Sequence, residues 1–111
     1  MQAFFGGIAN AKLWTGQQGI AMPLHYDSAD NMYVMLSGRK RALLAEPGQM
    51  DVFYRYPNKH PKVGSSQVNL SNPNLAEHPR FARAKLWETV VGPGDVLFLP
   101  SQLVASIRAA L

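Results

Sequence analysis

Two side chains that can bind a metal ion stand two residues apart near the start of the chain. His25 and Asp27 lie in the stretch "PLHYDSADN", which alternates as a β-strand does, so both side chains are predicted to leave the same face. A neutral imidazole beside a carboxylate forms half of a metal site. A hydrogen-bonded polar pair at a strand edge has the same spacing, so the spacing alone leaves both interpretations open.

The composition limits what could complete such a site. The 111-residue chain has no cysteine, so disulfides and thiolate zinc sites are excluded, and any metal must be bound by His, Asp, Glu or water. No basic leader precedes the first apolar residues, and no apolar run approaches the roughly 20 residues that span a bilayer. We therefore expect a soluble protein without membrane contact, located in the cytoplasm or the nucleus.

The basic residues fall into two short groups, which supply much of the net charge of +4: residues 39–41, and Arg80 with Arg83 and Lys85. Binding of nucleic acid would require these groups to join into a stripe with aromatic stacking partners. Their spacing indicates neither feature. We predict two solvated surfaces and no clear nucleic-acid binding.

The elements that must position the candidate residues are short strands. Strands are expected in residues 8–16 and 22–28, in 31–47 as a hairpin around Ser37-Gly38-Arg39, and in "LWETVV", "VLFLP" and "LVASIRA". Residues 47–85 hold five of the eight prolines and are predicted to form an insertion with one or two short helices. Short strands broken by turns indicate an all-β sandwich or barrel, here a single domain over residues 1–111.

Several motifs in the same order give the chain a recognisable family likeness. The stretches "PLHYDSADN", "GRKRALL", "YRYPNKHP", "SSQVNLSNPNLAEHPRF" and "ETVVGPGDVLFLP" resemble those of the JmjC-type, cupin-like Fe(II)- and 2-oxoglutarate-dependent dioxygenases, with the greatest likeness to asparaginyl hydroxylases. The resemblance implies a double-stranded β-helix, or jelly roll. It also implies a protein or peptide substrate.

Carried over by position, the resemblance implies that His25 and Asp27 are two of three iron ligands. Lys40 falls where the family places the lysine that pairs with the distal carboxylate of 2-oxoglutarate, a contact that suits a compact ammonium. Asn31 and Tyr33 would face the co-substrate. An exposed hairpin lysine is the alternative for Lys40, and a core aromatic is the alternative for Tyr33. Two His and one carboxylate leave open iron positions for 2-oxoglutarate and dioxygen.

The chain departs from the family pattern at the third ligand. After "VLFLP" the family has an aromatic pair and then a histidine, whereas this chain has Leu103, Val104 and Ala105. Met22 stands where a threonine usually helps to hold 2-oxoglutarate. His60 and His78 are the other histidines. His60 lies in the insertion, where the family has no ligand, and His78 precedes Pro79 at a helix start, so we expect it to cap that helix or to be exposed.

The resemblance also implies a further strand after "LVASIRA", so we expect a β-helix that is truncated at its C-terminus. The function that follows is an Fe(II)/2-oxoglutarate dioxygenase of the JmjC protein-hydroxylase class, impaired by Ala105. A non-catalytic JmjC-like remnant or binding module, or a truncated gene product, are the alternatives.

Overall fold

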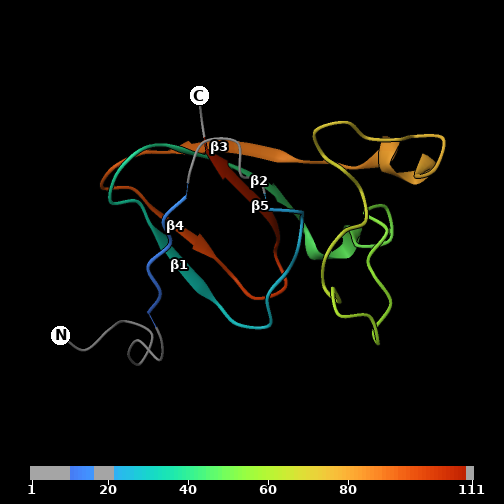
Figure 1. The fold of residues 1–111 in the computed structure, drawn as a ribbon, viewed down its shortest axis with the longest axis horizontal. Coiled ribbons are helices and arrows are strands. Elements are labelled where there is room, and N and C mark those ends of the chain that lie inside the picture. The colour runs from blue at the N-terminus through green and yellow to red at the C-terminus, as the bar shows by residue number, and fades with distance from the viewer. Residues whose placement is uncertain (1–10, 17–21, 110–111) are drawn as a thin grey trace.

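Two antiparallel sheets form the framework of a computed structural model, which describes residues 11–16 and 22–109 (Figure 1). The strands are β1 (Asn31–Val34), β2 (Lys40–Ala45), β3 (Trp87–Val91), β4 (Val96–Leu99) and β5 (Val104–Ala109), and the only helices in these ranges are the short 3₁₀ turns η1 (Pro47–Gln49) and η2 (Pro79–Arg83). The all-β prediction is confirmed. None of the helices in the described ranges is long and apolar enough to cross a membrane.

The two sheets are linked by connections that cross between them. One sheet has the order β3-β2-β5, and the other pairs β1 with β4. The hairpin predicted around residues 37–39 is therefore wrong, because β1 and β2 belong to different sheets. Met35 instead donates its N–H to the carbonyl of Asp95 at 3.0 Å and accepts the N–H of Gly94 at 2.9 Å. Backbone pairing thus holds the two crossing connections side by side, as in a jelly roll.

Two other predicted strands differ from the structure. Residues 8–10 lie outside the described ranges, and residues 11–16 form no strand. The stretch 22–28 contributes only bridges at His25, one to Ala105 and one to Ser65. Pro23 cannot donate to a ladder, although the N–H of Met22 before it donates to the carbonyl of Ile107 at 3.5 Å.

Alternation gives the three-stranded sheet two chemically different faces. Its core face carries Ala45 of β2 and Val104 of β5, which are fully buried and directly opposite each other. Residues from the segment 47–85 cover this face, and the buried cluster consists of Leu24, Ala45, Val52, Phe53 and Val104. The other face carries Lys40, Ala42 and Leu44 of β2. We call this second face the site face.

The segment 47–85 is ordered by a few buried contacts although it has almost no regular structure. Phe53 is fully buried and packs at 6.0 Å, ring centroid to ring centroid, against Phe81 of η2. Pro79 opens η2, as predicted. His78 precedes it but makes no capping bond, and its side chain is buried against the ring of Tyr54, with centroids 4.6 Å apart. His78 thus lies at the helix start, but the expectation that it caps the helix or is exposed is wrong, because its ring packs against Tyr54.

Ser66 joins the two arms of this segment, and its removal tests that role. Its buried hydroxyl donates to the carbonyl of Phe53 at 2.6 Å and accepts the N–H of Val68 at 3.0 Å. In Ser66→Ala both backbone groups lose their partner, so the free energy of unfolding should fall by about 1–3 kcal/mol in urea denaturation. The exposed Ser37→Ala serves as the control, with a change within about 0.5 kcal/mol. Equal losses in both variants would contradict this role.

Candidate metal and co-substrate site

His25 is placed by its pairing with two segments that are distant in the sequence. Its N–H donates to the carbonyl of Ala105 at 3.0 Å, and the N–H of Ala105 donates back at 2.8 Å. On its other side it forms a bridge with Ser65. Residues opposite each other in an antiparallel pair project to the same face. His25, Ala105 and Ser65 therefore share the site face with Leu44, which is the partner of Ala105 on β2.

The side chains of His25 and Asp27 converge, as predicted from their spacing. Nε2 of His25 lies 3.9 Å from Oδ2 of Asp27. Nδ1 of His25 lies 3.0 Å from the carbonyl of Pro23, and because a carbonyl can only accept, Nδ1 carries the proton. This hydrogen bond leaves the lone pair of a neutral imidazole on Nε2, the atom that faces Asp27.

Asn31 holds the carboxylate of this pair. Its amide donates to Oδ2 of Asp27 at 3.2 Å and to the carbonyl of Ala29 at 3.3 Å. The loop is also tied to the turn before β5, since the N–H of Gln102 donates to the carbonyl of Asp27 at 2.9 Å. A second tie runs from the N–H of Ser101 to Oδ1 of Asp30 at 2.7 Å. The loop that bears Asp27 is thus fixed to the strand that bears Ala105.

No third ligand joins the pair in the described part of the chain, where no group of three His, Cys, Asp or Glu side chains could hold a metal ion. His60 is exposed and stacks on Tyr56, with its Nδ1 accepting the N–H of Lys62 at 3.0 Å. His78 is buried in the segment 47–85. The methyl group of Ala105 occupies the position on the site face directly beside His25.

Lys40 lies on the site face, four residues before Leu44 on the same strand. Lys40 is half-buried. Its Nζ lies next to Gly16, since a Cβ added at Gly16 would be 3.5 Å from it. Among the described residues its ammonium has no hydrogen-bond or ion-pair partner. A half-buried cation without a carboxylate nearby favours an anionic ligand.

Tyr33 lies on the same side of β1 as Asn31 and is half-buried, whereas Met32 and Val34 between and beyond them are exposed. Burial raises the pKa of the Tyr33 phenol above its ordinary value. The phenol therefore stays neutral and can donate a hydrogen bond. The placement fits both the co-substrate role and the core-aromatic alternative.

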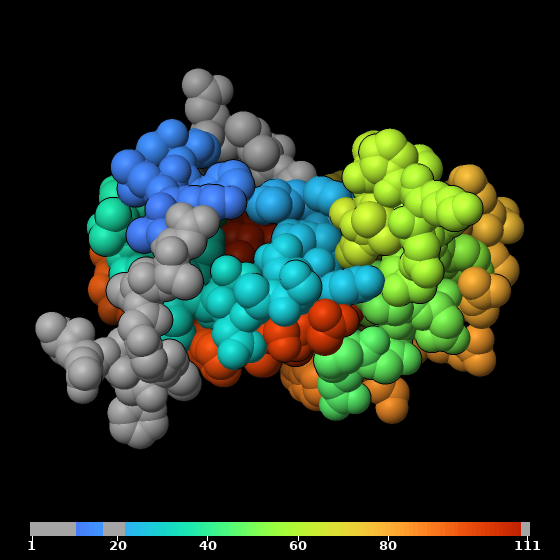
Figure 2. All heavy atoms as spheres, turned by 90° about the horizontal axis from the view of Figure 1, so that it is seen from below, coloured from blue at the N-terminus to red at the C-terminus, as the bar shows by residue number. Residues whose placement is uncertain are grey.

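A hollow opens beside these residues. Figure 2 shows it between the atoms of residues 11–16 in blue, residues 22–27 in lighter blue and β1 in teal, with dark red atoms of β5 at its bottom. The site face of β5 carries Ala105, Ile107 and Ala109, so this face of the strand is apolar. An apolar face with few polar groups around it is typical of small-molecule sites.

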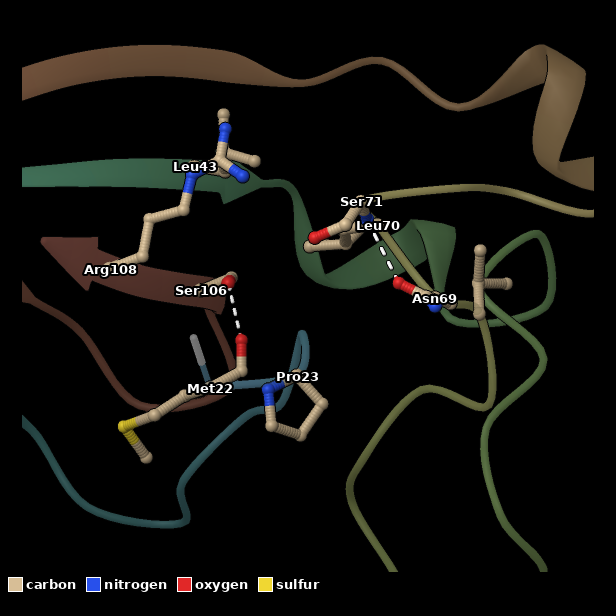
Figure 3. Close-up of a pocket in the computed structure, with 9 residues that line it drawn as sticks. Met22, Pro23, Leu43, Asn69, Leu70, Ser71, Ser106 and Arg108 are labelled. Carbon is tan, nitrogen blue, oxygen red and sulfur yellow. Dashed lines mark hydrogen bonds between the residues drawn. The ribbon is translucent and has the colours of Figure 1, made fainter. Parts of the chain in front are cut away.

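A separate cavity of about 180 Å³ lies on the core face (Figure 3). Ser106 donates its hydroxyl to the carbonyl of Met22 at 2.6 Å at one side of it. Leu43, Ser106 and Arg108 line it, and all three alternate with the residues of the site face. Met22 also lines this cavity and not the site face, so the structure gives no support to its predicted effect on co-substrate binding.

Sequence reasoning missed two residues next to the candidate site. Ser65 is half-buried and adjacent to His25 on the site face. Arg55 donates from Nη1 to the hydroxyl of Tyr26 at 3.2 Å, and Tyr26 lies between the two candidate ligands in sequence. Both come from the segment 47–85, which no local pattern connects to residues 25–27, so only the fold reveals these contacts.

Comparisons with known proteins agree with this architecture. Residues 1–104 match the model of the cupin-like domain. The relatives include "Lysine-specific demethylase 8" of Danio rerio, 40% identical over 90 residues, which are 80% of this chain and 22% of the relative. "tRNA wybutosine-synthesizing protein 5" of Homo sapiens is 35% identical over 83 residues, 75% of this chain and 25% of the relative.

"Jumonji C domain-containing protein 5" of Drosophila melanogaster is 28% identical over 103 residues, 93% of this chain. The chain spans about a quarter of the length of these curated relatives. The similarity therefore covers most of this chain but only one part of each relative. By this match along nearly its whole length, the chain belongs to the cupin-like domain family and is homologous to JmjC proteins.

Proposed function

We propose that the chain carries the metal and co-substrate site of an Fe(II)/2-oxoglutarate dioxygenase of the JmjC protein-hydroxylase class, with turnover impaired at Ala105. The observation that carries the proposal is the convergence of Nε2 of His25 and Oδ2 of Asp27 at 3.9 Å on the site face. Membership of the cupin-like domain family supports it.

The donor chemistry fits a divalent iron ion. The tautomer set by Pro23 aims a lone pair of His25 at the space beside Asp27, and the amide of Asn31 orients the carboxylate. Imidazole and carboxylate are the donor types of the two-histidine, one-carboxylate iron sites. Bound iron would supply the activation of dioxygen, with 2-oxoglutarate as the source of electrons.

Each remaining residue has a role that its placement permits. Lys40 would pair with the distal carboxylate of 2-oxoglutarate, since its half-buried ammonium has no carboxylate partner in the described ranges. The phenolic hydroxyl of Tyr33 would donate a hydrogen bond to the co-substrate. The apolar site face of β5 would exclude water around the target C–H bond.

Ala105 favours a second candidate, a non-catalytic binding module. A methyl group cannot coordinate, so the described protein groups offer at most two ligands, which leaves the geometry of the metal loosely controlled. The proposed contacts of Lys40 and Tyr33 with 2-oxoglutarate do not require the third metal ligand. A module of this kind would retain 2-oxoglutarate binding and lack turnover.

Relatives in this family differ in the macromolecule that their names mention. The names of two relatives point to a lysine-specific demethylase in one case and to a tRNA-modifying protein in the other. The likeness to asparaginyl hydroxylases adds a third possibility, a hydroxylated asparagine in a protein.

Metal affinity should be weak and should depend on the residue at position 105. In Ala105→His the added imidazole would stand beside His25, so Mn(II) affinity should rise at least about tenfold, or ~1.4 kcal/mol. The measurement is an anaerobic titration of free Mn(II) by electron paramagnetic resonance.

Ile107→His is the matched control, because it adds an imidazole to the same face of the same strand but two residues away. It should not raise the affinity, and His25→Ala should abolish binding. Tight Mn(II) binding by the unchanged chain that survives His25→Ala would refute the ligand assignment.

Co-substrate binding should depend on Lys40. Lys40→Met should weaken Mn(II)-supported binding of 2-oxoglutarate by about tenfold or more in calorimetric titration, because the distal carboxylate loses a charge-assisted hydrogen bond. Arg39→Met removes the same charge at the exposed neighbouring residue and should have no such effect. An equal loss in both variants would show that only long-range charge matters.

Turnover by the unchanged chain should be near background. Release of labelled CO₂ from 2-oxoglutarate should match that of His25→Ala, because the third ligand is absent. Ala105→His alone should not restore turnover, since Leu103 and Val104 stand where the family has supporting aromatics. Decarboxylation by the unchanged chain well above the His25→Ala blank would overturn the impairment and exclude the non-catalytic module.

A further inference from the structure

The net charge of the protein is concentrated in one segment. Residues 47–85 contain six Lys and Arg residues and two carboxylates, a net charge of +4 that equals the net charge of the whole chain. Lys, Arg, Asp and Glu elsewhere in the chain cancel. Between Asp51 and Glu77 there is no acidic residue at all. A segment of this kind presents a positive potential to a partner.

Part of this segment, residues 55–62, combines cations with stacked rings; we call it the basic loop. The ring of His60 lies over the ring of Tyr56, with centroids 4.3 Å apart and planes 18° apart. Nζ of Lys62 lies 5.8 Å from the centroid of Tyr56. The bond from the N–H of Lys62 to Nδ1 of His60 fixes the imidazole in place. His60 and Lys59 are exposed, so the loop offers a prearranged stack with cations around it.

The basic loop lies next to the candidate metal site. Arg55 bridges to Ser66, and Tyr56 donates its N–H to the carbonyl of Ser65, the neighbour of His25 on the site face. Arg55 also donates to the hydroxyl of Tyr26. Figure 2 shows the yellow-green atoms of this part of the chain beside the light blue atoms of residues 22–27, which border the hollow on their other side. A polymer that lies along the loop would run toward His25 and Asp27.

We propose that the basic loop binds single-stranded nucleic acid. Cations that follow a backbone of phosphates, together with aromatic faces on which bases stack, are the two elements of such recognition. An acidic peptide would use the cations, but its carboxylate side chains have no aromatic face to stack on the pair of Tyr56 and His60. The basic loop is distinct from the two charge groups at residues 39–41 and 80–85, and it contains its own aromatic partners, Tyr56 and His60. The proposal rests on the proposed function only where the bound strand is also the substrate.

Binding is tested with the full chain and without metal. Fluorescence anisotropy with labelled oligouridylate and oligothymidylate of about 12 nucleotides, in EDTA, should show saturable binding at low salt. With Arg55, Lys59 and Lys62 as the phosphate contacts, log K should fall with log salt with a slope of about −2, since each contact on a single strand contributes about −0.7. An oligoglutamate of equal charge should bind several-fold more weakly.

Substitutions separate stacking from charge. His60→Ala should weaken binding at least about fivefold without changing the salt slope, and His60→Phe should restore it, because the phenyl ring can still stack. Lys59→Ala should reduce the slope by about 0.7. Arg39→Ala removes an equal charge from an exposed residue outside the segment 47–85 and should leave the slope unchanged. Circular dichroism melting confirms that each variant is folded.

The result that overturns the proposal is absence of oligonucleotide binding at low salt, tighter binding of the oligoglutamate, or equal effects of Lys59→Ala and Arg39→Ala. These outcomes are distinct from failure of the proposed function. If the chain does not bind the oligonucleotide but still binds Mn(II) through His25, this inference alone is refuted. Oligonucleotide binding without His25-dependent Mn(II) binding refutes the metal site alone.

Discussion

The reciprocal hydrogen bonds between His25 and Ala105 are the contact on which the candidate site depends. They join the segment around residue 25 to β5, which lies eighty residues later in the chain. Through Ala105 the row continues to Leu44 of β2 and Trp87 of β3, and through His25 it continues to Ser65. A shift by one residue in this pairing would turn every side chain of the slipped segment to the other face. The register therefore decides that His25 faces the hollow and that Leu24 faces the core.

One sheet consequently presents two opposite environments. Its core face is buried under Phe53 and its neighbours, which provides the hydrophobic free energy of folding. Its site face keeps the imidazole of His25 and the ammonium of Lys40 in a partly open space. A metal site needs this combination, because its ligands must be accessible while the backbone that carries them is rigid. Asn31 and the anchored loop from Asp27 to Asp30 extend the rigidity to the carboxylate.

The segment 47–85 contributes to both faces. Its apolar residues cover the core face, and Ser65 adds one more row to the sheet at His25. Gly64 makes this close approach possible, since it adopts φ +87° and the ring and carbonyl of Tyr26 lie within 4 Å of where a side chain would begin. Its cations then lie outside the hydrophobic contacts, so the segment that stabilises the fold also carries the excess positive charge.

The sequence by itself determined the elements and the local chemistry. Alternation and turn residues predicted β1, β2, β3, β4 and β5, and the two-residue spacing predicted that His25 and Asp27 converge, because these features depend only on neighbours in the chain. Membership of the cupin-like family followed from motif order. The roles of Lys40, Asn31 and Tyr33 were inferred from position and stay predictions. Only the tertiary structure decided how the strands pair, since the turn at residues 37–39 suits a hairpin as well as a crossing between sheets. It alone placed Ala105, Ser65 and Arg55 around His25 and Tyr26, because contacts between segments 29 to 80 residues apart depend on the pairing register of the whole sheet and leave no local pattern.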